Sequence, residues 1–162
     1  MATKERLVIL KKDDIGKKLN RLACQILENH TQTEHIQFIG MNERGYQLAK
    51  LLIEKIKRLD KTQKTSLFQG LSEKSVEIVN QNKLESKNAI IVVDDVLNTG
   101  RSIYFLLAHL AEIKPRQLEI CVLAHRHHKQ FPIHANYVGL TFATTVQEHI
   151  FFDISKPELY LE

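Results

Sequence analysis

Short apolar runs alternate along the chain with segments in which apolar residues recur every three or four positions. The apolar, β-branched runs predict strands buried on both faces, and they occupy residues 36–41, 89–93 and 118–124. The helical spacing predicts amphipathic helices, and it occupies residues 15–27, 48–59 and 103–110. This alternation predicts an α/β fold built on an open sheet.

Shorter segments predict the remaining elements. Residues 6–10 form a predicted edge strand, and Asp13 or Asp14 is expected to cap the helix that follows. Two further strands are expected to be joined by a turn at residues 71–74, and they occupy residues 65–70 and 75–79. Late strands are expected at residues 134–144 and 149–154.

The stretch AIIVVDDVLNTGRS, residues 89–102, joins a predicted strand to a predicted helix through a turn. The amino end of a helix presents unpaired backbone N–H groups and a partial positive charge, which suits a phosphate. Gly100 lacks a Cβ and allows the backbone to approach an anion closely. Asn98 forms the turn, and the hydroxyls of Thr99 and Ser102 are further donors beside Arg101. The sequence therefore predicts a phosphate site at residues 98–102.

Two carboxylates, Asp94 and Asp95, are expected to end the strand before this turn. Ionised carboxylates only accept hydrogen bonds, and the vicinal hydroxyls of a sugar are good donors. A phosphate on the turn and a sugar on the acids would make a ribose-5-phosphate site. Both acids can reach one sugar only if the strand bends away at Asp95, because successive strand residues point to opposite faces. The alternative interpretation is a capped turn with two solvated acids.

A second strand–loop–helix unit contains the sequence MNERG, and it is a second candidate anion site. Its residues are Met41, Asn42, Glu43, Arg44 and Gly45.

The composition narrows the class of protein but does not point to a particular reaction. The 162 residues suggest one domain, and 43% hydrophobic with 26% charged residues is ordinary for a globular chain. Cys24 and Cys121 lie in apolar periodic segments and are expected to be buried thiols in a reducing cytoplasm. We expect no signal peptide and no membrane span. The net charge of +4 permits a polyanionic partner without requiring one.

Three segments carry a family resemblance. VVDDVLNTGRS resembles the phosphoribosyl pyrophosphate (PRPP) motif of type I phosphoribosyltransferases. IGMNERGYQLAKLL and HRHHKQFPIHANYVG are similar to segments of the pyrimidine-operon attenuation regulators, which are also uracil phosphoribosyltransferases. The resemblance covers about residues 15–154 and is weakest between residues 59 and 87.

This resemblance implies a fold and a reaction. The fold would be a mostly parallel sheet with helices on both faces, in one domain spanning residues 1–162. A small hood would come from the N-terminal segment and about residues 125–162. The reaction would transfer ribose 5-phosphate from PRPP to a pyrimidine such as uracil, with Mg²⁺ bound through PRPP. Relatives of this kind form dimers or larger assemblies, so we expect a homodimer at least.

The resemblance also assigns roles to residues. Asp94 and Asp95 would be catalytic, residues 98–102 would bind PRPP, and residues 41–45 would be the pyrophosphate loop. The loop near the base would contain Arg126 and His128, with Tyr137 and Val138 close by. The histidines in this region, His125, His127, His128 and His134, lack an ordered metal-ligand spacing, and we predict no metal site there.

Several positions depart from the family pattern. Relatives usually carry a basic residue and a threonine where Asn42 and Glu43 stand, and an acid and a glycine where His125 and His127 stand. The mobile hairpin that closes over PRPP is expected to be largely missing, so transfer is expected to be slow. The alternative function is a nucleotide-sensing regulator with weak or no catalysis. It would bind RNA through a basic helix face formed by Lys17, Lys18 and Arg21. The alternative interpretation of these three residues is a solvated helix surface.

Overall fold

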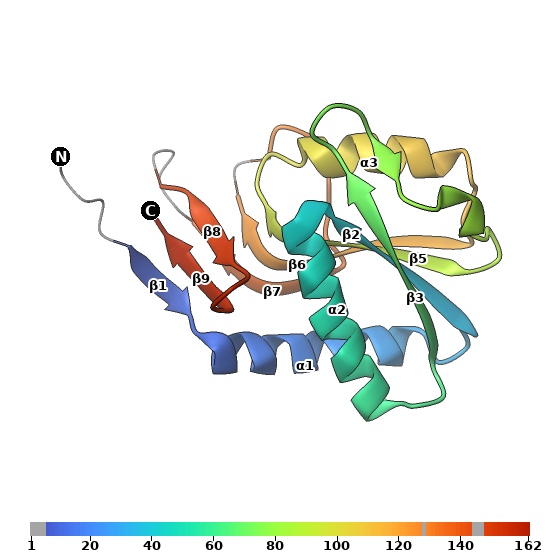
Figure 1. Ribbon diagram of the computed structural model, residues 1–162, viewed down its shortest axis with the longest axis horizontal. Coiled ribbons are helices and arrows are strands. Elements are labelled where there is room, and N and C mark those ends of the chain that lie inside the picture. Colours follow the sequence, from blue (N-terminus) through green and yellow to red (C-terminus); the bar gives the residue numbers. More distant parts are fainter. Residues whose placement is uncertain (1–5, 128, 144–147) are drawn as a thin grey trace.

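The computed structural model describes residues 6–127, 129–143 and 148–162 of the chain (Figure 1). A central sheet has the strand order β4-β3-β2-β5-β6-β7. Its strands are β2 (His35–Met41), β3 (Lys64–Leu71), β4 (Glu77–Ile78), β5 (Ala89–Leu97), β6 (Gln117–Arg126) and β7 (Tyr137–Phe142). All neighbouring pairs are parallel except β3 and β4. The predicted α/β fold with a mostly parallel sheet is therefore confirmed.

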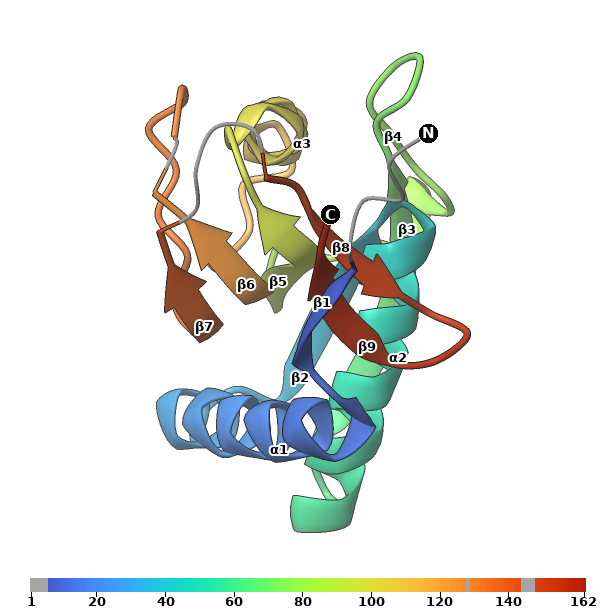
Figure 2. The same ribbon diagram turned by 90° about the vertical axis from the view of Figure 1, so that its left-hand side faces the viewer.

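Helices cover both faces of this sheet (Figures 1 and 2). Helices α1 (Lys12–Asn29) and α2 (Asn42–Leu59) pack on one face, and α3 (Arg101–Ala111) packs on the other. Alternate residues of β5 show the division, because Ile91 and Val93 pack with α1 and α2 whereas Ile90 and Val92 pack with α3. A strand buried on both faces needs a continuous apolar run, which is what residues 89–93 supply.

The order of strands reverses between β2 and β5. From β2 the chain passes through α2 to β3 on one side, and from β5 it passes through α3 to β6 on the other. Ligands of open α/β sheets bind at the carboxyl ends of the strands where the order reverses. This rule places a site at the ends of β2 and β5, where the two predicted anion sites lie.

A small second sheet forms the hood, with strand order β1-β9-β8 (Figure 2). Its strands are β1 (Leu7–Leu10), β8 (Ile150–Asp153) and β9 (Glu158–Leu161), and both pairs are antiparallel. The strand expected at residues 134–144 does not belong to the hood. It forms β7, which pairs in parallel with β6 at the edge of the central sheet.

The start of α1 differs from the prediction that Asp13 or Asp14 caps it. Helix α1 begins at Lys12, so both acids lie within its first turn. Asp14 still satisfies a free donor, because its carboxylate accepts a hydrogen bond from the Lys11 backbone N–H at 3.2 Å. No helix in the described part of the chain is long and apolar enough to cross a membrane.

A buried polar cluster joins α1 to β6 and β7 at the amino end of the sheet. The Glu119 carboxylate lies 2.7 Å from His30 Nε2 and accepts hydrogen bonds from the Tyr137 hydroxyl at 3.0 Å and from Gln117 Nε2 at 2.7 Å. Asn29 Nδ2 donates to the Tyr137 hydroxyl at 3.1 Å. Burial raises the pKa of Glu119, but the hydrogen bonds from His30 and Tyr137 outweigh burial and leave the pKa lowered.

This cluster predicts a pH dependence of stability. Because the folded protein lowers the pKa of Glu119, the ionised carboxylate stabilises the fold above the unfolded pKa of about 4.3. That contribution is lost as pH falls through the lower folded pKa. We expect Glu119→Gln to reduce the free energy of unfolding by about 1–3 kcal/mol at pH 7, and by less at pH 3. Urea unfolding at both pH values measures this difference, and equal losses at both would contradict the explanation.

Candidate active site

The turn after β5 has the geometry that an anion site requires. Gly100 has a φ of +82°, a left-handed conformation that favours glycine, and α3 begins at the next residue. A Cβ at Gly100 would lie 3.0 Å from Ile133 Cγ1, so a side chain there meets both strain and contact. The backbone N–H groups of Gln130 and Phe131 both donate to the Thr99 carbonyl at 3.0 Å and brace the turn from behind. The amino end of α3 is thus held at the carboxyl end of β5.

A cavity of about 260 Å³ lies at this turn. It brings together the acid pair, the turn, the start of α3 and one residue from the start of α2, which is Asn42. The lining residues are Asn42 at the start of α2, the β5 residues Asp94, Asp95, Val96 and Leu97, and, from the turn and the start of α3, Asn98, Thr99, Gly100, Arg101, Ser102 and Ile103. Of the second predicted anion site, Asn42 lines this cavity, whereas Met41, Glu43, Arg44 and Gly45 do not.

The acid pair lies inside β5 and not at its end, because the strand continues to Leu97 in regular register with β6. Both acids nevertheless line the cavity. The Asp95 backbone N–H donates to Asp94 Oδ1 at 2.9 Å. Burial, and next the negative charge of Asp95, raise the pKa of Asp94 well above its ordinary value, while the positive charge of Arg44 acts in the opposite direction.

The predicted pyrophosphate loop is the first turn of α2 and not a separate loop. Met41 is the last residue of β2, and residues 42–45 are already helical. Gly45 is required by packing, because a Cβ there would lie 2.6 Å from the Val93 carbonyl oxygen of β5. The missing side chain lets the amino end of α2 lie directly against the strand that carries the acids.

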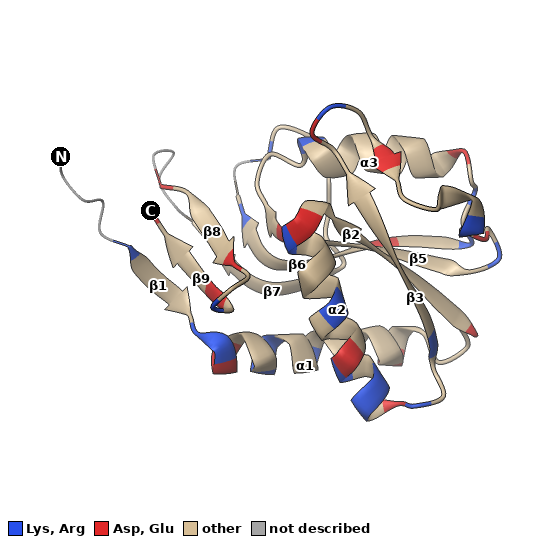
Figure 3. Cartoon of the chain, in the orientation of Figure 1, with Lys and Arg blue, Asp and Glu red and all other residues tan. Residues whose placement is uncertain are grey.

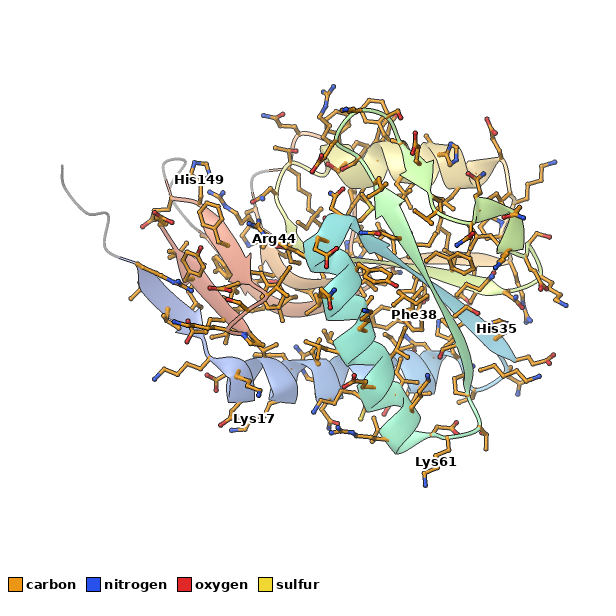
Figure 4. All side chains as sticks on the ribbon, in the orientation of Figure 1. Lys17, His35, Phe38, Arg44, Lys61 and His149 are labelled. Carbon is orange, nitrogen blue, oxygen red and sulfur yellow. The ribbon has the colours of Figure 1, made fainter. Side chains whose placement is uncertain are left out.

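The two charged side chains of this turn, Glu43 and Arg44, are not among the residues that line the cavity. Glu43 is exposed and accepts a hydrogen bond from Gln47 Nε2 at 2.7 Å, so it turns along the helix surface and is not among the cavity-lining residues. Arg44 extends toward the hood (Figure 4), with its guanidinium carbon 5.9 Å from the centre of the Phe151 ring. A carboxylate in this position would not oppose a pyrophosphate in the cavity.

Asn42 is fixed to the β3–β4 hairpin by contacts that the sequence did not suggest. It has a φ of +50°, a left-handed conformation that asparagine tolerates better than most residues. Its Nδ2 donates to Ser72 Oγ at 3.0 Å, and the Ser72 backbone N–H donates to its Oδ1 at 3.1 Å. Gln69 Nε2 also donates to the Asn42 carbonyl at 3.3 Å. The hairpin therefore positions the amino end of α2.

The residues predicted near the base separate in the structure. Arg126 ends β6, is buried, and donates from Nη1 to Asn98 Oδ1 at 3.4 Å, which places it beside the turn. His128 lies outside the described residues. Tyr137 and Val138 begin β7 opposite Cys121 and Val122, in the middle of β6, where Val122 also pairs with Asp94 of β5. The Tyr137 hydroxyl belongs to the cluster around Glu119. The structure does not bring these two residues to the cavity.

His125 stands where relatives usually carry an acid, and it was not among the predicted site residues. It pairs in register with Leu97, which lines the cavity, and its Nε2 is buried without a hydrogen-bond partner in the described part of the chain. Burial, and then the charges of Lys129, His127 and His134, lower its pKa, so the ring is neutral at neutral pH. Its place at the end of an apolar strand was the available signal.

Comparisons with known proteins agree with this geometry. The family model described as Phosphoribosyl transferase domain matches residues 8–153. This chain belongs to the phosphoribosyltransferase family. Two relatives named Bifunctional protein PyrR, from Elusimicrobium minutum and Deinococcus radiodurans, are each 31% identical over 158 residues. The matches cover 89% and 90% of this phosphoribosyltransferase and 87% and 86% of those proteins.

Solved structures show the same fold. A hypoxanthine-guanine phosphoribosyltransferase from Bacillus anthracis superposes on this phosphoribosyltransferase with a TM-score of 0.78 and 22% sequence identity. The match covers 94% of this chain and 95% of that one. A hypoxanthine phosphoribosyltransferase from Staphylococcus aureus gives a TM-score of 0.74 at 20% identity, over 91% of this chain and 81% of that one. At such identities the similarity shows the fold alone.

The contacts of Asn42 predict coupled effects on stability. Asn42→Ala removes both side-chain hydrogen bonds and puts alanine in a left-handed conformation, so we expect a decrease of about 1–3 kcal/mol in the free energy of unfolding. Ser72→Ala removes one bond and should cost about 1 kcal/mol. The double variant should be destabilised by less than the sum of the two, because the residues share an interaction. Urea unfolding tests this, with exposed Glu43→Ala as the control within about 0.5 kcal/mol of wild type; strict additivity would contradict the interaction.

Proposed function

We propose that this phosphoribosyltransferase binds PRPP in the cavity and transfers ribose 5-phosphate to a pyrimidine base such as uracil, releasing pyrophosphate. The observation that carries the proposal is the convergence of two helix amino ends and an acid pair on one cavity of about 260 Å³. Each helix end suits one phosphate group of the substrate, and the acids suit the sugar between them.

The groups of PRPP can be assigned by chemistry. The 5′-phosphate would accept hydrogen bonds from the backbone N–H groups of residues 100–102 and from the hydroxyls of Thr99 and Ser102. The Arg101 guanidinium lies 5.3 Å from the Phe105 ring centre, so Arg101 would contribute through its backbone. The ribose hydroxyls would donate to Asp94 and Asp95. The pyrophosphate would lie at the amino end of α2, between Asn42 and Arg44.

The reaction breaks the bond between the ribose C1 and the pyrophosphate oxygen and forms a bond from C1 to a ring nitrogen of the base. The breaking bond leaves positive charge on the ribose, and the nearby carboxylates stabilise that charge. The amino end of α2 stabilises the negative charge on the leaving pyrophosphate. Mg²⁺ binds through one or two carboxylates together with substrate phosphates, and Asp94 and Asp95 are donors of that kind; when bound, it neutralises phosphate charge.

Two features bear on the base and on the rate. His125 is neutral and has a free ring nitrogen near the end of β6, so it can exchange hydrogen bonds with the polar edge of a base. The β3–β4 hairpin is tied to Asn42, and we expect transfer to be slower than in enzymes whose hairpin closes over PRPP. The hairpin is the reason for this expectation, because Glu43 faces away from the cavity and would not oppose a bound pyrophosphate.

The test is a pyrophosphate-release assay with PRPP, Mg²⁺ and a panel of bases. We expect release with uracil, and a decrease of about a hundredfold in kcat/KM for Gly100→Val, which removes at least two hydrogen bonds to a charged phosphate. Asp95→Asn should lower kcat more than it raises KM. Gly16→Val is the matched control, because a Cβ at Gly16 meets only Lys55 Nζ at 3.9 Å.

Release with purine bases and not with uracil would show that the substrate is a purine, and it would contradict the proposed pyrimidine. No release with any base, together with unchanged binding of PRPP in Gly100→Val by calorimetry, would contradict the assignment of the cavity.

A second candidate function is an RNA-binding regulator on the same fold. The observation that favours it is a basic depression of about 620 Å³ between α1 and α2, lined by Lys12, Asp13, Gly16, Lys17, Asn20 and Lys55. Lysines and arginines gather along α1 and the far half of α2, among several acids (Figure 3). Arg21 instead joins α1 to β7, because its Nη2 donates to the carbonyls of Val138 and Gly139 at 3.0 and 2.8 Å.

The structure therefore narrows the test of RNA binding to two lysines. Lys17→Glu with Lys18→Glu should weaken binding and make the slope of log K against log salt shallower by about one for each RNA phosphate that is no longer neutralised. Lys74→Glu with Lys83→Glu is the charge-matched control on the opposite part of the molecule, and its slope should match wild type. An equal change in both double variants would contradict a specific surface, and no binding at low salt would exclude this function.

A further inference from the structure

Arg44 leaves the first turn of α2 toward the hood and meets an aromatic ring there (Figure 4). Its guanidinium carbon lies 5.9 Å from the centre of the Phe151 ring, within the range of a cation–π contact. Arg44 makes no hydrogen bond and no ion pair with the described residues of the chain. Its N–H donors are therefore available to a ligand, and a guanidinium is well suited to phosphate oxygens.

The Phe151 ring lies on the side of the hood sheet that faces away from the core. Ile150 and Phe152, on either side of it in β8, are buried in the apolar cluster that includes residues of β5. Phe151 points the opposite way, because successive strand residues alternate. It stacks on Tyr160, its partner in β9, with 5.5 Å between the ring centres and 24° between the ring planes.

A second arginine covers the Tyr160 ring. The Arg6 guanidinium carbon lies 3.6 Å from the centre of that ring. Asp153 and Glu158 hold Arg6, because each carboxylate lies 3.3 Å from Arg6 Nη2. These contacts order the rings of the hood without a ligand, so the Phe151 ring is a preorganised surface.

Electrostatics connect Arg44 with the acid pair of the cavity. Burial and the negative charge of Asp95 raise the pKa of Asp94, and the positive charge of Arg44 acts against them. The guanidinium is thus within electrostatic reach of the acids proposed to hold the ribose, although it does not line the cavity itself. A pyrophosphate on the ribose C1 would extend from these acids toward the amino end of α2, which is where Arg44 begins.

We propose that Phe151 is a positioning residue for PRPP, because its ring holds the Arg44 guanidinium in place to bind the pyrophosphate group. This inference rests on the proposed function, since it requires PRPP in the cavity. Without the ring, the long Arg44 side chain must be ordered when PRPP binds, and that ordering lowers the affinity. A ligand that lacks pyrophosphate does not need Arg44 and keeps its affinity. The hood, through Phe151, thus contributes to binding of the leaving group.

Isothermal titration calorimetry with PRPP and Mg²⁺, in the absence of a base, tests this role. Uridine monophosphate is the comparison ligand, because it has no pyrophosphate. Phe151→Leu keeps an apolar side chain and removes the ring, so we expect it to raise the Kd of PRPP about fivefold and to leave the Kd of uridine monophosphate unchanged. Phe151→Tyr keeps the ring and should keep the wild-type affinity for PRPP.

Tyr46→Leu is the matched control for loss of a ring. It removes a cation–ring contact elsewhere on α2, in which Lys50 Nζ lies 4.9 Å from the Tyr46 ring centre. This contact does not involve the hood, so both ligands should bind Tyr46→Leu with wild-type affinity. A weakening of PRPP binding in Tyr46→Leu equal to that in Phe151→Leu would overturn the specific role of Phe151.

A double-mutant cycle separates positioning of Arg44 from a general effect on the hood. Arg44→Gln should raise the Kd of PRPP by about tenfold or more. Phe151→Leu should add nothing in that background, because the ring then has no guanidinium to hold. Full additivity of the two substitutions, or equal losses for PRPP and uridine monophosphate in Phe151→Leu, would overturn the proposal.

The wild-type protein separates this inference from the function on which it rests. Wild type that binds uridine monophosphate and not PRPP would overturn the role of Phe151 and leave the nucleotide site in place. Wild type that binds neither ligand would contradict the proposed function, and this inference with it.

Discussion

The reversal of strand order between β2 and β5 determines where the two helices after these strands begin. Connections between parallel strands are right-handed, so a reversal of direction places α2 and α3 on opposite faces of the sheet. The amino ends of both helices then meet at the same edge, where β2 and β5 end. Two positive helix ends on one cavity favour a ligand with two separated phosphate groups. The acid pair on β5 lies between them and favours the sugar that joins such groups.

Close packing at this edge decides which residues can occupy it. Gly45 lets α2 lie against the backbone of β5, and Gly100 lets α3 begin one residue after a left-handed turn. The same closeness removes water from Asp94 and raises its pKa, a cost to folding that the polar cluster and the apolar core elsewhere offset. Asn42 is held by Ser72, so the β3–β4 hairpin braces the amino end of α2.

The sequence predicted the local parts of this arrangement and missed the long-range ones. The unit from Ala89 to Leu110 could be predicted because its strand, turn and helix follow one another directly in the sequence, with a glycine at the turn. The bond between Asn42 and Ser72 could not be predicted, because it depends on how β3 and β4 return to the end of β2. Arg21 has the pattern of a solvated helix residue, yet it is tied to β7 through carbonyls that carry no sequence signal.

The assignment of β7 failed for a related reason. A short apolar strand has the same pattern in a hood as at the edge of a central sheet, and only its pairing with β6 distinguishes the two. That pairing places Tyr137 beside Cys121 in the middle of β6, and Tyr137 is not among the residues that line the cavity. The hood is formed instead by segments near the two ends of the chain, β1 and the β8–β9 hairpin.

A crystal structure of the protein with uridine monophosphate would show where the phosphate and the ribose bind. We predict that the nucleotide phosphate lies at the amino end of α3, within about 2.7–3.2 Å of backbone nitrogens in residues 100–102, with the ribose hydroxyls on Asp94 and Asp95. A nucleotide bound elsewhere, such as in the basic depression between α1 and α2, or a phosphate facing the acid pair, would contradict this assignment.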